Sequence, residues 1–226
     1  MAGNVGLVKT GSGTLALNGA NTFAGNTTIA GGTLQISGAV TNSAFVVVTN
    51  AATLQLSGGK ITAGMVHIYT NAFLVGCGTI NGVLLNDGTV VSSCGTNITF
   101  SGAVTNNGTM RLTAGTQLNA AGPFVNNGLL DLINAAGSLP PGFVNHGVVL
   151  DSGSVQVSQI FISGTDVQMQ ILSAAGHTYQ LQRSGSLNPA SWGDIGASQS
   201  GTGGVLIFTD NLALIQPQGF YRFKVN

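Results

Sequence analysis

Apolar residues separated by one position recur through the first two-thirds of the chain. The paired positions are Leu15/Leu17, Leu34/Ile36, Leu54/Leu56, Leu74/Gly76, Val90/Ser92, Met110/Leu112 and Leu130/Leu132, followed by Val149. The first members recur at a nearly constant interval, apart from one shorter step between Leu74 and Val90. Alternation at i and i+2 is the period of a β-strand with one buried face. The pattern therefore predicts short strands that stack in register, one in each coil of about 20 residues.

Triplets of the form Asn-x-Gly precede the later pairs by a constant interval. They are Asn86-Asp87-Gly88, Asn106-Asn107-Gly108, Asn126-Asn127-Gly128 and Asn145-His146-Gly147. Asn and Gly tolerate positive φ, so these triplets are typical of sharp corners. Two further apolar series share the spacing: Leu84, Val104, Phe124 and Phe143, and Ile98, Leu118 and Leu139. Because one coil cannot bury its own apolar face, stacking must bury it, and residues 1–152 are predicted to form a parallel β-helix (a β-solenoid).

The repeat ends at Asp151, where an acid occupies the position of inward-facing leucines in earlier coils. Burying a lone carboxylate there would be costly. Residues 153–226 are predicted to form a small antiparallel β-sandwich that caps the β-helix, which makes the protein all-β. Its expected strands are Val155–Ile162, Val167–Ile171, Thr178–Arg183, Trp192–Ile195, Val205–Thr209 and Phe220–Val225.

Charged residues make up only 5% of the 226 residues, and the formal net charge is zero. Ordinary globular proteins carry about 25%. The chain has no basic stripe to bind phosphates, so nucleic acid is not an expected partner. It has no apolar run long enough to span a membrane, and no signal peptide is evident at Met1-Ala2-Gly3-Asn4. We expect a mature fragment that begins within a repeat.

The stretch Lys9–Ser37 carries Gly13-Thr14-Leu15, Asn21-Thr22-Phe23 and Gly32-Thr33-Leu34. It resembles the autotransporter-associated β-strand repeat. The tail, with Tyr179-Gln180-Leu181-Gln182-Arg183-Ser184, Trp192 and Phe220-Tyr221-Arg222, resembles modules that close large secreted bacterial repeat proteins. This resemblance implies a right-handed parallel β-helix outside the cell or at its surface, and it brings no catalytic residues.

Cys77 and Cys94 are separated in the sequence by slightly less than one coil. Stacked positions fall within the Cα separation of about 4.4–6.8 Å that a disulfide requires. A disulfide is the favoured interpretation, and two free buried thiols are the alternative. The register gives Cys77 outward and Cys94 inward parity, although the short local coil can change this. Two cysteines without a nearby His do not make a zinc site, so no metal or other cofactor is expected.

Other polar residues also stack by register. Arg111 and Asp131 both face outward, which predicts a surface ion pair, with a sugar-binding rim as the functional alternative. The corner amides are predicted to hydrogen-bond from coil to coil rather than to line a ligand site. They are Asn86, Asn106, Asn126 and Asn145.

The remaining candidates are predicted to be structural. Thr14, Thr33, Thr53, Thr89 and Thr109 form a row only one residue wide, which does not suit ice binding. No carboxylate stands at a motif spacing from His67, His146 or His177, and His146 is predicted to be a solvent-facing corner residue.

Polysaccharide-cleaving β-helices need clustered carboxylates, whereas this solenoid offers only Asp87, Asp131 and Asp151, well apart. No catalytic residue is expected. The first coil presents unpaired strands, and exposed edges pair with other chains. We therefore expect a non-enzymatic extracellular or cell-surface protein that assembles head to tail into a filament or surface fibre. The alternative is an adhesin-like autotransporter passenger fragment displayed as a monomeric rod, with surface glycans as partner.

Overall fold

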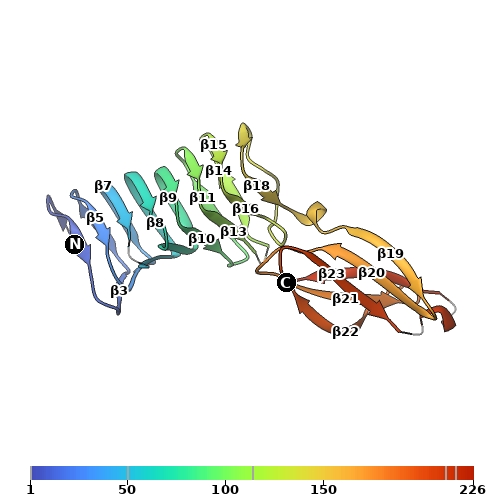
Figure 1. Ribbon diagram of the computed structural model, residues 1–226. Helices are drawn as coiled ribbons and strands as arrows, with labels where there is room; N and C mark the ends of the chain where they lie inside the picture. Colours follow the sequence, from blue (N-terminus) through green and yellow to red (C-terminus); the bar gives the residue numbers. More distant parts are fainter. Residues whose placement is uncertain (1, 50, 114, 212, 217) are drawn as a thin grey trace. The chain divides into compact units, whose positions relative to one another are not determined.

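A computed structural model of the protein describes residues 2–49, 51–113, 115–211, 213–216 and 218–226 (Figure 1). The chain divides into two compact units, Met1–Asp151 and Ser152–Asn226. The regular structure is β throughout the described residues, apart from two short 3-10 turns in the second unit. No helix in the described part of the chain is long and apolar enough to cross a membrane.

The first unit is a parallel β-helix whose strands stack on three faces, here called A, B and C. Every neighbouring pair within a face is parallel. Face A contains β3 (Thr14–Leu17), β6 (Thr33–Ile36), the first parts of β8 (Thr53–Ile68) and β9 (Phe73–Asn86), β10 (Thr89–Ser92), β13 (Thr109–Leu112), β16 (Leu129–Asp131) and β18 (Val148–Leu150).

Faces B and C complete each coil. Face B contains β1 (Ala2–Gly3), β4 (Ala20–Phe23), the first part of β7 (Ala39–Val48), the middle parts of β8 and β9, β11 (Asn97–Phe100) and β14 (Gln117–Ala120). Face C contains β2 (Leu7–Lys9), β5 (Thr27–Ile29), the last parts of β7, β8 and β9, β12 (Val104–Asn106), β15 (Phe124–Asn126) and β17 (Phe143–Asn145).

The register of face A agrees with the spacing of the apolar pairs. Leu15 pairs with Leu34, which pairs with Leu54, and the series continues through Leu74, Val90, Met110 and Leu130 to Val149. Most of these side chains are fully buried in one continuous core. The predicted all-β fold, a parallel β-helix with the coil length expected from the apolar pairs, is confirmed.

The short step between Leu74 and Val90 arises at all three corners of that coil. Between β8 and β9 the register shifts by one residue at the corner after Ser57 and again at the corner after Thr62. The corner between faces C and A also becomes tighter. Earlier, Tyr69–Ala72 forms a wider turn in which Asn71 has a φ of 64°. From Asp87 onward the corner is the tight Asn-x-Gly triplet. A Cβ added at Gly108 would lie 2.1 Å from the carbonyl oxygen of Gly88, so only glycine permits this close stacking.

Face B ends one coil earlier than faces A and C. Between β16 and β17 the chain forms no strand, and a single bridge joins Ala136 to Gln117. One expectation about face B therefore fails, and one about face A fails for a separate reason. Leu139, expected to stack inward beneath Leu118, is 40% exposed. The threonine row on face A is interrupted, because Phe73 lies between Thr53 and Thr89.

The second unit has two three-stranded antiparallel sheets within its described residues, and all six strands expected from the sequence are present. One sheet has the order β19 (Val157–Ser163), β20 (Asp166–Leu172) and β23 (Val205–Asp210), and the other β22 (Gly193–Ser200), β21 (Thr178–Ser184) and β24 (Phe220–Val225). The 3-10 turns are η1 (Ser152–Ser154) and η2 (Ala213–Ile215). Its core includes Met169, Ile171, Tyr179, Leu181 and Phe208.

Candidate functional site

A row of buried asparagine amides runs along the inner side of the corner between faces C and A. Asn86 donates from Nδ2 to Oδ1 of Asn106 at 2.6 Å, Asn106 donates to Asn126 at 2.7 Å, and Asn126 donates to Asn145 at 2.7 Å. The first three side chains are 0% exposed, and Asn145 is exposed. The stacking thus places all four predicted corner amides together as a coil-to-coil row.

The same inward position has a different chemistry in the earlier coils. Lys9, Ile29, Val48 and Ile68 stack there before the asparagines begin. The change coincides with the tight corner, where Gly88 donates its backbone N–H to Oδ1 of Asn86 at 3.2 Å. The amide therefore serves the turn as well as its neighbours, which explains why a polar side chain is tolerated in the core.

A second polar row lies on the outer side of this corner and includes His67. Asn127 donates to Asn107 at 2.8 Å, and Asn107 donates to Oδ1 of Asp87 at 2.7 Å. His67 Nε2 lies 2.6 Å from the other oxygen of Asp87, and the His67 ring stacks on Tyr69 with centroids 3.7 Å apart. The expectation that His67 lacks a carboxylate partner was wrong. The separation of one coil between His67 and Asp87 was the signal that could have found the pair.

The hydrogen bond from Asn107 lowers the pKa of Asp87 below its ordinary value of 3.8. The hydrogen bond and positive charge of His67 act in the same direction, whereas partial burial of the carboxyl opposes them. Asp87 is therefore held as a carboxylate, and it anchors the row of amides that donate toward it.

A disulfide joins Cys77 and Cys94, whose Cα atoms are 6.3 Å apart. The parity assigned to them was wrong, because Cys77 is 6% exposed and Cys94 is exposed. Cys77 Sγ lies 2.9 Å from the hydroxyl of Ser92, a fully buried side chain. The strand β9 continues through its corners without loops. The backbone bends at Gly76, where φ is 92°, and the Cys77 side chain after this bend points inward.

Arg111 and Asp131 are register partners on face A, and Arg111 donates from Nε to Asp131 Oδ2 at 2.8 Å. The expected outward position of Asp131 was wrong, since its side chain is 0% exposed. The backbone N–H of Ile133 donates to its other oxygen at 3.3 Å, because the chain turns back directly after β16. Asp131 is therefore a buried, paired carboxylate.

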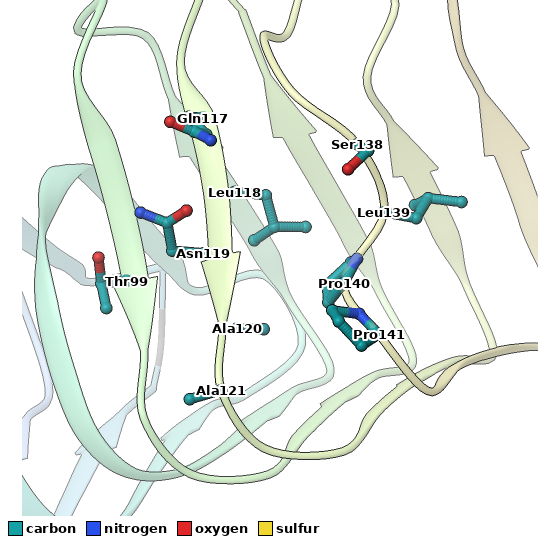
Figure 2. A pocket seen from close by; sticks show the side chains of 10 residues that line it. All are labelled: Thr99, Gln117, Leu118, Asn119, Ala120, Ala121, Ser138, Leu139, Pro140 and Pro141. Atoms are coloured by element: carbon teal, nitrogen blue, oxygen red, sulfur yellow. The ribbon is translucent and has the colours of Figure 1, made fainter.

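Cavities open on the β-helix among the described residues. The first has a volume of about 310 Å³ and lies between β14 and the segment 138–141, as Figure 2 shows. Its lining residues are Thr99, Gln117, Leu118, Asn119, Ala120, Ala121, Ser138, Leu139, Pro140 and Pro141. The second has about 530 Å³, lies beside the disulfide and shares Thr99 with the first. No group of three or more His, Cys, Asp or Glu among the described residues could hold a metal ion.

Residues 7–36, which span β2 to β6, match the family model of the passenger-associated-transport repeat. This confirms the resemblance seen in Lys9–Ser37, and with the β-helix it indicates an autotransporter passenger-type repeat region. Such a repeat suggests a secreted or surface-displayed protein. No curated protein and no solved structure matches the chain.

Proposed function

We propose that this chain is a non-enzymatic structural protein outside the cell or at its surface, and that copies assemble head to tail through the ends of the β-helix. Repeats of the matched family are typically structural, which supports the first part. The second part rests on the strands of the first coil and on the charge that they carry.

The observation that carries the proposal is the inward position of Lys9. It is the one charged residue on β2 and β3, and it is 7% exposed. Its ammonium donates to the carbonyl oxygens of Thr10, Gly11 and Gly31, each at 2.8 Å. Strand edges are usually kept from pairing with other chains by exposed charges, especially lysine. Here the lysine is turned into the protein, while Val8 beside it is 68% exposed.

The low charge of the coils favours stacking between copies, because few charged side chains oppose the pairing of strand edges. A head-to-tail contact joins two different surfaces, and such a contact produces a filament when it does not close into a ring. Parallel stacking across the junction would continue the spacing of about 4.8 Å found within a β-helix.

Sedimentation velocity and negative-stain electron microscopy of the purified chain test the proposal. The double variant Val8→Lys/Ala16→Lys places two exposed charges on β2 and β3 and is expected to remain monomeric. The matched control Gln55→Lys/Thr105→Lys adds the same charge to interior coils and is expected to assemble as the natural chain does. A natural chain that stays monomeric at its highest soluble concentration would overturn the proposal and favour the monomeric, adhesin-like rod.

A further inference from the structure

The cavity in Figure 2 exists because face B lacks a strand beyond β14. In the preceding coils each face-B strand is covered by the next, as β11 is by β14. After β16 the chain instead leaves the coil and passes at a distance from Leu118 and Ala120. Pro140 and Pro141 stand across the gap, as the close view shows. The result is a groove with a floor of core residues and two walls of different chemistry.

The first wall carries polar side chains that have no partner of their own. Thr99 and Asn119 are register neighbours, yet within the described residues neither they nor Gln117 make a side-chain hydrogen bond. Ser138 on the opposite side also makes no side-chain hydrogen bond within the described residues. Elsewhere on the β-helix some polar side chains on adjacent coils pair with each other: Asn18 with Ser37 at 2.8 Å, Gln35 with Ser57 at 3.0 Å, and Asn81 with Ser101 at 2.6 Å.

The second wall is apolar and the whole groove is uncharged. Leu139 is 40% exposed, and Pro140 and Pro141 lie beside it. No charged residue lines this cavity or the adjoining one. A neutral saccharide has the matching chemistry, since its hydroxyl groups both donate and accept hydrogen bonds and its C–H faces pack on apolar surfaces. Amides and hydroxyls supply both donors and acceptors for such a ligand.

We propose that this groove binds a neutral oligosaccharide. Asn119, Gln117, Thr99 and Ser138 hydrogen-bond its hydroxyl groups, and Pro140 and Pro141 pack against a sugar ring. The adjoining cavity extends the path along face B through Thr99 and Thr79, which are register neighbours. The preferred ligand is therefore a linear chain of several sugars rather than a monosaccharide. Lys60 follows Thr79 in the same row but lines neither cavity.

This inference does not depend on self-assembly, because the groove belongs to a single chain. The test therefore uses the Val8→Lys/Ala16→Lys background, in which filament formation is not expected. Isothermal titration calorimetry is carried out with neutral hexasaccharides (cello-, laminari-, xylo- and mannohexaose), with hexagalacturonate, and with an octapeptide of alternating Thr and Val. Amide NMR spectra of the same mixtures show which residues respond.

At least one neutral hexasaccharide should bind saturably, with shifts at Thr99 and at Gln117–Ala121, and hexagalacturonate should bind at least about tenfold more weakly. Adding Gln117→Ala/Asn119→Ala should weaken binding about tenfold or more. The control Gln55→Ala/Thr105→Ala, on faces A and C, should leave it within about twofold.

Four results would overturn the assignment. They are no binding of any neutral hexasaccharide, equal or tighter binding of hexagalacturonate, unchanged affinity in a Gln117→Ala/Asn119→Ala variant with native circular dichroism, and shifts in the groove caused only by the octapeptide. The last would assign the groove to strand addition along β14.

Discussion

Asn86 donates a hydrogen bond from Nδ2 to Oδ1 of Asn106, 2.6 Å away on the next coil, and neither side chain is exposed. Asn107, the residue next to Asn106, also bonds to both neighbouring coils, but at the surface. The two asparagines thus make similar contacts at very different burial.

Replacing Asn106 should therefore be far more damaging than replacing Asn107. Asn106→Ala removes the bond that Asn86 Nδ2 donates to it and the bond that Asn126 Oδ1 accepts from it, both inside the core. It should lower the free energy of unfolding by about 2–4 kcal/mol. Asn107→Ala should lower it by less than about 1 kcal/mol, because water replaces the lost bonds. Urea titrations followed by circular dichroism measure both changes. Equal losses would show that the inner row is not a buried network.

Reduction of the Cys77–Cys94 bond should destabilise the β-helix. The bond closes a loop with a sequence separation of 17, for which loop-closure entropy predicts about 3 kcal/mol. A reducing agent should lower the urea midpoint of the natural chain, and Cys77→Ser/Cys94→Ser should start from that lower value and not respond. If the reducing agent leaves the urea midpoint of the natural chain unchanged, Cys77 and Cys94 are two free thiols, which was the alternative interpretation of the sequence.

Asp87 should contribute an acid-dependent part of the stability. Its pKa in the folded chain is below the ordinary 3.8, so the unfolded chain binds the proton more readily. The contribution is present above about pH 4 and is lost as pH falls through the folded pKa. Asp87→Asn should flatten the stability curve below pH 4. Thermal unfolding of both proteins between pH 2 and 6 gives the comparison, and parallel curves would contradict the prediction.

Tyr221 should contribute stability that is lost in alkali. Burial, with the adjacent Asp210 carboxylate, raises the pKa of its hydroxyl from 10.0 to about 12. The hydroxyl donates to Asp210 Oδ2 at 2.7 Å, and Asp210 is 5% exposed. Because the raised pKa favours the neutral form in the folded state, the contribution is full below pH 10 and disappears as pH rises towards 12. Tyr221→Phe should remove this alkaline dependence.

Ultraviolet titration of tyrosinate checks the same group directly. The chain has three tyrosines, so the step missing from the Tyr221→Phe spectrum reports Tyr221 alone. That step should lie near pH 12, and a missing step near pH 10 would contradict the prediction.

Much of the fold could be predicted because a β-helix repeats its local rules. The positions of Leu15, Leu34, Leu54 and their successors fix the register, since a shift by one residue would turn each buried side chain outward. The same alignment predicted that Arg111 meets Asp131 and that the corner asparagines meet each other. Each of these pairs follows from a separation of one coil.

The groove could not be predicted in this way. The interval from Leu130 to Val149 is close to the regular repeat, yet the chain within it forms no face-B strand. The prolines at 140 and 141 remove backbone donors and favour this departure. The path of the whole coil decides where the departing segment passes. That path leaves Leu139 facing solvent and leaves Asn119 without a side-chain partner.

The sequence by itself determined the coil length, the inward positions of face A, the corners and the strands of the second unit, because these depend on side-chain periodicity and turn preference. Only the tertiary structure decided that Lys9 turns inward, that Asp131 is buried and that face B stops at β14. These features depend on contacts between residues about a coil apart, and on corners that change their shape midway along the β-helix. Such contacts arise only when the coils are stacked, because stacking decides which side chains and backbone groups meet and which are left open to water.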